Sequence, residues 1–184
     1  FREVYRVLRD DGSLWLNLGD SYFAASPTNG AMRRKTHAHP TLKVKDLVGI
    51  PWKVAFALQE AGWYLRSDII WAKDQIMPES VRDRPSRAHE YLFLLTKQSD
   101  YFYDAQAIRE PLQAKVLENL SDEAKEGGRN CRTVWRINPT HYKGAHLAVF
   151  PEEIPDRCIR AGMSEKGACP KCGAPWTRIL ERTT

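Results

Sequence analysis

The sequence predicts an α/β fold, in which helices pack against a layered sheet. Apolar segments of strand length alternate with amphipathic or buried helices along the 184 residues. The hydrophobic share of 42% can build a core, and the length fits about one domain of ordinary size. No internal repeat is visible.

The N-terminal part predicts a helix, a strand and a long basic loop. Residues 1–9 form an amphipathic helix because their apolar residues recur at i, i+3, i+4 and i+7. An Asp-Asp-Gly turn at 10–12 ends this helix. Residues 13–18 read as a buried strand that ends at a glycine-containing turn. Residues 21–45 hold no Asp or Glu and many basic residues, which indicates a long basic loop.

The middle of the chain predicts a buried helix and two further strands. Residues 51–61 begin with a proline, are apolar nearly all round, and are followed by Gly62 as a C-terminal cap. A strand is expected over 63–71 and another over 89–97, which is rich in Tyr, Phe and Leu. The loop at 73–88 between them carries several arginines.

The C-terminal half predicts shorter elements. Residues 101–103 are expected to pair with the preceding strand across a turn. Residues 105–130 look helical and then loose, and 134–137 form a short strand. Residues 150–161 predict a short helix with an acidic first turn, which ends at Gly162.

Composition limits the classes of function. The net charge of +5 favours a polyanionic partner, although many other proteins are mildly basic. No stretch approaches the about 18 apolar residues of a membrane span, so no membrane partner is expected. Four cysteines beside six tryptophans fit a reducing cytoplasm better than a disulfide scaffold. The chain begins with Phe inside a predicted helix, so we expect its natural N-terminus to lie upstream.

Four segments match a known family in the family's own order. They are FREVYRVLRDDGSLWLNLGDSY at 1–22, DLVGIPWKVAFALQEAGWYLRSDIIWAK at 46–73, MPESVRDRPSRAHEYLFLLTK at 77–97 and HLAVFPEEIPDRCI at 146–159. Together they resemble the DNA N4/N6-methylase family, in the subgroup whose catalytic strand comes first and whose cofactor-binding strand comes late. The resemblance implies a Rossmann-like, mostly parallel methyltransferase sheet, present in part, with helices on both faces.

The resemblance also implies which parts of the family lie outside the chain. The catalytic Asp/Ser-Pro-Pro-Tyr/Phe motif is expected upstream of Phe1, and the glycine-rich cofactor motif is expected beyond Thr184; neither occurs within the sequence. We therefore expect no activity from the chain alone. The expected regions are a partial catalytic domain at 1–104, a target-recognition region at 105–145, a cofactor-proximal helix at 146–162 and the start of a zinc-knuckle-like insert at 163–184.

The implied activity is methyl transfer from S-adenosylmethionine to the exocyclic amine of cytosine (N4) or adenine (N6) in duplex DNA, with the target base flipped out of the stack. Cytosine is slightly favoured, because the family members that look most alike carry the Ser-Pro-Pro-Tyr form. Two alternatives stay open: a non-catalytic DNA-binding module with a zinc knuckle, and a methyltransferase of the same sheet that acts on RNA or a small molecule. A homodimer is also left open.

Five residues are candidates for cofactor binding. Asn17 and Asp20 follow a strand at its carboxyl end, where open α/β sheets bind ligands. A satisfied turn is the alternative for both. The resemblance implies that His146, Phe150 and Pro151 contact the methionine end of S-adenosylmethionine; an ordinary helix N-terminus is the alternative.

Eight residues are candidates for DNA binding. Basic side chains in the two loops are suited to phosphate contacts, although a charge run can also be a solvated face. Trp71 either stacks on a base or belongs to the core. The candidates are Arg33, Arg34, Lys35, Trp71, Lys73, Arg82, Arg84 and Arg87.

Cys169 and Cys172, followed by glycine, resemble half of a zinc knuckle. Structural zinc needs four ligands, so the other pair is expected beyond Thr184. Two inert thiols are the alternative.

Overall fold

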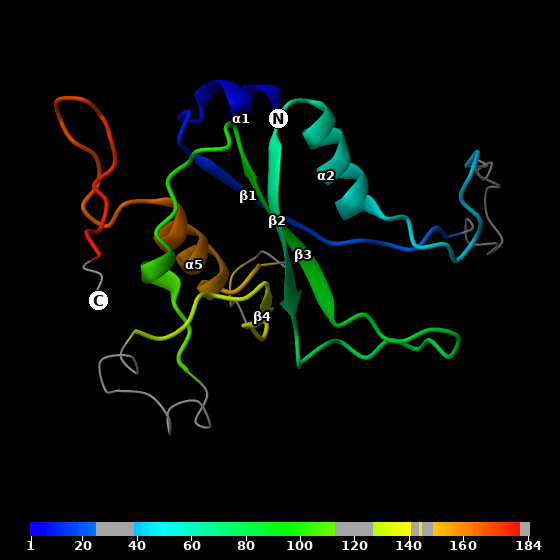
Figure 1. The fold of residues 1–184 in the computed structure, drawn as a ribbon. Coiled ribbons are helices and arrows are strands. Elements are labelled where there is room, and N and C mark those ends of the chain that lie inside the picture. The colour runs from blue at the N-terminus through cyan, green and yellow to red at the C-terminus, as the bar shows by residue number, and fades with distance from the viewer. Residues whose placement is uncertain (25–38, 113–126, 141–143, 145–148, 181–184) are drawn as a thin grey trace.

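The computed structural model describes residues 1–24, 39–112, 127–140, 144 and 149–180. These residues form one four-stranded sheet with helices on both faces (Figure 1). No helix in the described ranges is long and apolar enough to cross a membrane. The strands are β1 (Ser13–Leu18), β2 (Tyr64–Ala72), β3 (His89–Thr96) and β4 (Val134–Arg136).

The strand order is β1-β3-β2-β4, with β3 antiparallel to both of its neighbours. Only the β2–β4 pair is parallel. The expectation of a mostly parallel sheet is therefore wrong for this part of the molecule. The reason is that β2 and β3 are consecutive strands joined by the loop at 73–88, without the crossover helix that a parallel connection needs. β1 and β2 still run in the same direction, because each is antiparallel to β3.

The two faces of the sheet are covered by different helices, as the sequence predicted. Helices α1 (Arg2–Val7) and α2 (Ile50–Glu60) pack on one face, and α5 (Glu153–Gly162) packs on the other. Successive β3 side chains alternate between these layers, so Leu92 joins the α5 side while Phe93 joins the α2 side. This double coverage explains why β3 reads as a continuous apolar run.

Helix α2 is fixed at both ends by backbone conformation. Gly49, which precedes it, has a φ of 76°, and Pro51 occupies the first turn. Gly62 follows the helix with a φ of 96°, a left-handed conformation that favours glycine. The predicted helix at 51–61 is confirmed to within one residue at each end.

Residues 101–103 differ from the prediction. They form no strand with β3; instead the Phe102 amide donates to the Asp11 carbonyl at 2.9 Å, beside the end of α1. The following segment begins with a single 3-10 turn, η1 (Ala105–Ile108), which contacts α5. Residues 105–130 were expected to be helical and then loose, and the part at 113–126 lies outside the described residues.

Candidate functional site

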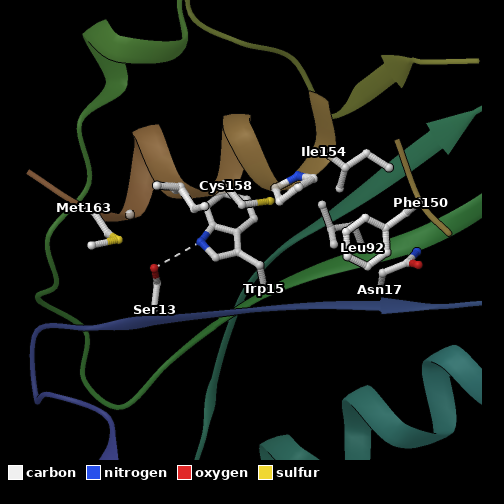
Figure 2. A pocket seen from close by; sticks show the side chains of 11 residues that line it. Ser13, Trp15, Asn17, Leu92, Phe150, Ile154, Cys158 and Met163 are labelled. Atoms are coloured by element: carbon white, nitrogen blue, oxygen red, sulfur yellow. Dashed lines mark hydrogen bonds between the residues drawn. The ribbon is translucent and has the colours of Figure 1, made fainter. Parts of the chain in front are cut away.

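A hollow of about 450 Å³ lies between β1 and α5 (Figure 2). Its walls are largely apolar, with Trp15 and Leu92 from the sheet and Ile154 from the helix. At one end the Trp15 indole Nε1 donates to the Ser13 hydroxyl at 3.1 Å. The hollow can therefore accept a ligand that has both an apolar body and a few polar groups.

Two of the predicted cofactor residues meet in this hollow. Asn17 shares a strand face with Ser13 and Trp15, since side chains two apart on a strand point the same way. Its Nδ2 donates to the Tyr91 carbonyl at 3.1 Å, which orients the amide. Phe150 enters from the segment before α5 and is 48% exposed. Figure 2 shows both side chains at the same end of the hollow.

Of the other predicted cofactor residues, Pro151 and Asp20 do not line this hollow. His146 lies outside the described residues. Pro151 is buried, and its carbonyl accepts the Ile154 amide at 3.1 Å. Asp20 is turned towards α2, where one carboxylate oxygen accepts the Gly49 and Ile50 amides at 2.9 and 3.0 Å. At Asp20 the geometry favours the alternative, a satisfied turn.

The end of β2 holds Trp71 and Lys73. Trp71 is 4% exposed, and its indole Nε1 donates to the Ile137 carbonyl at 2.7 Å. The Lys73 ammonium lies 4.0 Å from the centre of the Trp71 ring and pairs with Glu90. For Trp71 this arrangement favours the core interpretation over stacking on a base.

The arginines of the loop at 73–88 are mostly engaged with the protein. Arg84 pairs with Glu79 at 2.7 Å and stacks over the Tyr22 ring at 3.9 Å. Arg87 lies 3.8 Å from the Asp20 carboxylate, and its Nε and Nη1 are buried without a hydrogen-bond partner among the described residues. Arg82 is exposed. The candidates at 33–35 lie outside the described residues.

Sequence reasoning missed a second group of arginines. Arg129, Arg132 and Arg136 line a separate hollow of about 880 Å³ beside β4, together with Arg157 of α5 and the carboxylate of Glu110. Three of these arginines lie within eight consecutive residues, RNCRTVWR at 129–136, and this local density was the available signal.

Cys169 and Cys172 lie in a tight hairpin. The Gly173 amide donates to the Cys169 carbonyl at 2.8 Å, with a φ of 73° at Gly173. The backbone N–H groups of Cys172 and Lys171, and then the Cys172 side chain, lower the pKa of the Cys169 thiol. Among the residues with described positions, no group of three or more His, Cys, Asp or Glu could hold a metal ion. A zinc knuckle is therefore not supported.

Comparisons with known proteins agree on one family. The sequence model of the N6/N4 methylase family, described as DNA methylase, matches residues 1–169. The chain is 48% identical over 176 residues to the type II methyltransferase M.SmaI of Serratia marcescens, which covers 91% of this chain and 57% of the relative. It is 50% identical over 170 residues to M.XycI of Xanthomonas campestris pv. cyanopsidis, at 88% and 53% coverage.

A solved structure shares the fold. It is described as the PvuII DNA methyltransferase, cytosine-N4-specific, and it aligns with a TM-score of 0.58 at 17% identity. The alignment covers 88% of this chain and 51% of the solved one. The chain spans about half the length of the curated relatives named above.

Proposed function

The chain belongs to the N6/N4 DNA methylase family, and from this premise we propose that the complete gene product transfers a methyl group from S-adenosylmethionine to the exocyclic amine of a base in duplex DNA. The observation that carries the proposal is the hollow between β1 and α5. Asn17 and Phe150 are distant in sequence and were assigned to the cofactor from sequence alone, yet they line the same hollow.

The residues present fit the methyl donor. Its cationic sulfonium suits an aromatic face, its adenine needs apolar surface, and the polar groups of its methionine end need hydrogen-bonding partners. We assign Phe150 to the sulfonium at the methionine end, Asn17 to the polar groups of that end, and Trp15 to the adenine. The bond from Asn17 Nδ2 to the Tyr91 carbonyl uses one donor and leaves the amide Oδ1 able to accept a hydrogen bond. When bound, the donor supplies an electrophilic methyl group.

The chemistry explains why such a site depends on positioning. The amine of cytosine or adenine is a poor nucleophile because its lone pair is conjugated with the ring. Hydrogen-bond acceptors that bind its N–H groups favour a pyramidal nitrogen. Holding the amine at a fixed distance from the methyl donor lowers the entropy that is lost on reaching the transition state. The contribution of this chain is to orient the donor through Asn17 of β1 and Phe150 of the segment before α5. No covalent intermediate with the protein is required.

The finer assignments are also part of the proposal. Cytosine N4 is preferred over adenine N6, in keeping with the description that the PvuII methyltransferase carries. Residues 105–145 are assigned to target recognition, and 1–104 and 146–162 to the catalytic domain and its cofactor-proximal helix. The exposed Arg82 and the basic residues at 33–35 are assigned to DNA phosphates, with the target base flipped out of the stack.

The decisive experiment uses the complete gene product. Methylation of host DNA is mapped at single-base resolution, and donor binding is measured by calorimetry for Phe150→Ala and Asn17→Ala. Phe56→Ala is the matched control, because Phe56 is 52% exposed on the opposite face of the sheet. We expect Phe150→Ala to weaken donor binding by about tenfold, or about 1.4 kcal/mol. Affinity equal to that of the control would contradict the assignment. DNA binding without donor binding would instead favour a non-catalytic module.

A further inference from the structure

A groove rich in arginine lies beside β4, away from the hollow assigned to the methyl donor. We call it the arginine groove and define it by Arg129, Arg132, Thr133, Arg136 and Arg157, with Glu110 at its base. Arg136 belongs to β4, Arg132 and Thr133 precede that strand, and Arg157 comes from α5.

Glu110 holds two of the arginines in place. Its Oε2 accepts from Nε of Arg129 at 3.2 Å and from Nε of Arg132 at 2.9 Å, while its Oε1 accepts the Arg132 backbone amide at 3.2 Å. The Glu110 side chain is 16% exposed. One carboxylate thus balances two guanidinium groups, which leaves one positive charge in excess. Both side-chain bonds use Nε, so Glu110 does not occupy the terminal nitrogens of either arginine.

The backbone beneath these side chains is fixed as well. Glu110 and Arg129 form a β-bridge, with N–O distances of 2.9 and 2.8 Å. Gly128 permits this close approach, since a Cβ at that position would lie 2.7 Å from the Glu110 carbonyl oxygen. The cationic groups are therefore arranged without a ligand, which lowers the entropy cost of binding one.

The other two arginines pair with carboxylates that do not line the groove. Arg136 is 70% exposed and pairs with Asp74, itself 59% exposed, at 3.1 Å. Arg157 pairs with Glu153 at 2.5 Å, at the rim of the groove. Exposed ion pairs contribute little free energy, so Arg136 can exchange its partner for a stronger anion at low cost. Arg132 is 59% exposed and reachable from solvent.

We propose that the arginine groove binds phosphates of the DNA backbone. The inference rests on the proposed function, because it takes duplex DNA as the substrate. Guanidinium groups bind phosphate with two parallel hydrogen bonds, and threonine hydroxyls supplement such contacts. Apart from Arg157 of α5, the groove lies within the residues assigned to target recognition, and it anchors them on the duplex without reading base edges.

The test measures binding of the complete gene product to two labelled, unmethylated duplexes. One contains the sequence that the protein methylates, and the other lacks it. Fluorescence anisotropy gives Kd between 50 and 200 mM salt for the wild type, Arg132→Gln and Arg132→Lys. Arg6→Gln is the matched control, because Arg6 is 70% exposed and pairs with Glu3 at 2.7 Å on α1. Arg136→Gln is a second groove variant in which both partners of the ion pair are exposed.

The logarithm of the association constant falls as the logarithm of the salt concentration rises, and loss of one phosphate contact should reduce the magnitude of this slope by about 0.9. The affinity gap between wild type and Arg132→Gln should therefore narrow about threefold between 50 and 200 mM salt. Both duplexes should respond alike, Arg132→Lys should retain the wild-type slope, and Arg136→Gln should show a reduced slope. Unchanged slopes in both glutamine variants, or a loss confined to the methylated sequence, would overturn the proposal.

Failure of this inference and failure of the proposed function remain distinguishable. If the wild type methylates DNA while both groove variants keep its salt slope, the groove assignment alone is wrong. If the wild type neither binds the donor nor methylates DNA, the proposed function is wrong, whatever the salt slopes show.

Discussion

The Asp20 carboxylate accepts the Gly49 amide at 2.9 Å, and this bond joins the end of β1 to the start of α2. The Ile50 amide donates to the same oxygen at 3.0 Å, so Asp20 satisfies two of the free N–H groups of the first turn. The negative charge also lies at the positive end of the helix dipole. Asp20 is a helix cap supplied from a distant position in the sequence.

Asp20→Ala should lower the free energy of unfolding by about 1–2 kcal/mol, because the first turn of α2 loses its acceptor. Asp20→Asn should cost less, since its amide oxygen can still accept. Urea unfolding of the complete gene product measures both. Asp46→Ala is the control, because it removes a half-buried carboxylate that accepts one backbone amide, from Lys43, in a turn outside any helix. If Asp20→Ala instead weakened donor binding at unchanged stability, Asp20 would belong to the cofactor site, as the sequence suggested.

Gly162 is required where the end of α5 crosses β1. A Cβ at this position would lie 2.7 Å from Ser13 Oγ and 3.2 Å from Trp15 Nε1. Gly162→Ala should destabilise the protein by about 1–3 kcal/mol through overpacking. Ser13→Ala removes the nearest atom, so the double variant should be more stable than the sum of the single effects predicts. A urea double-mutant cycle measures this coupling, and additivity within about 0.5 kcal/mol would refute the contact.

Local signals gave the bounds of several elements but not the direction of the strands. Strand β1 matches its predicted range residue for residue, because turn-forming residues bound the apolar run on both sides. Helix α2 was equally clear from its proline and glycine. The antiparallel placement of β3 had no local signature, since a strand covered on both faces has the same apolar pattern in either direction.

The sequence predicted only those residues of the candidate site that belong to segments matching the family. Asn17 and Phe150 were assigned by strand position and by resemblance, and their common hollow follows from the packing of α5 on β1. The contact between Glu110 and Arg132 depends on a β-bridge between distant segments, which no local pattern encodes. Trp71 stayed ambiguous in the sequence, because burial at that position depends on its pairing with β4.

Because Cys158 is buried, the stability of the protein should depend on pH in the alkaline range. Desolvation raises the pKa of this thiol from an ordinary 9.0 to about 12. As pH rises, the thiol therefore loses its proton in the unfolded state before it does so in the folded state. The contribution of the protonated thiol to the free energy of unfolding is complete below pH 9 and is lost as pH rises towards 12. The total effect is of the order of a few kcal/mol, at about 1.4 kcal/mol per pKa unit.

Cys158→Ala should accordingly flatten the decline of stability between pH 9 and 12. Urea unfolding at a series of pH values measures the effect. Ile154→Val is the control, since it removes one methylene group from the same core cluster without altering a titrating group. It should lower the free energy of unfolding equally at every pH. A Cys158→Ala curve parallel to that of the wild type would show that the thiol is not protected from ionisation.

Trp71→Phe distinguishes the two interpretations of this tryptophan. The substitution keeps an aromatic ring but removes the indole donor, which leaves the Ile137 carbonyl without that bond in the core. An unsatisfied buried group costs about 1–3 kcal/mol, so stability should fall by that amount. Duplex affinity should stay at the wild-type value, because the ring is 4% exposed. Trp176→Phe, at a position that is 54% exposed, should change neither quantity. Reduced duplex affinity at unchanged stability would mean that Trp71 leaves the core to stack on a base, at the expense of its bond to Ile137.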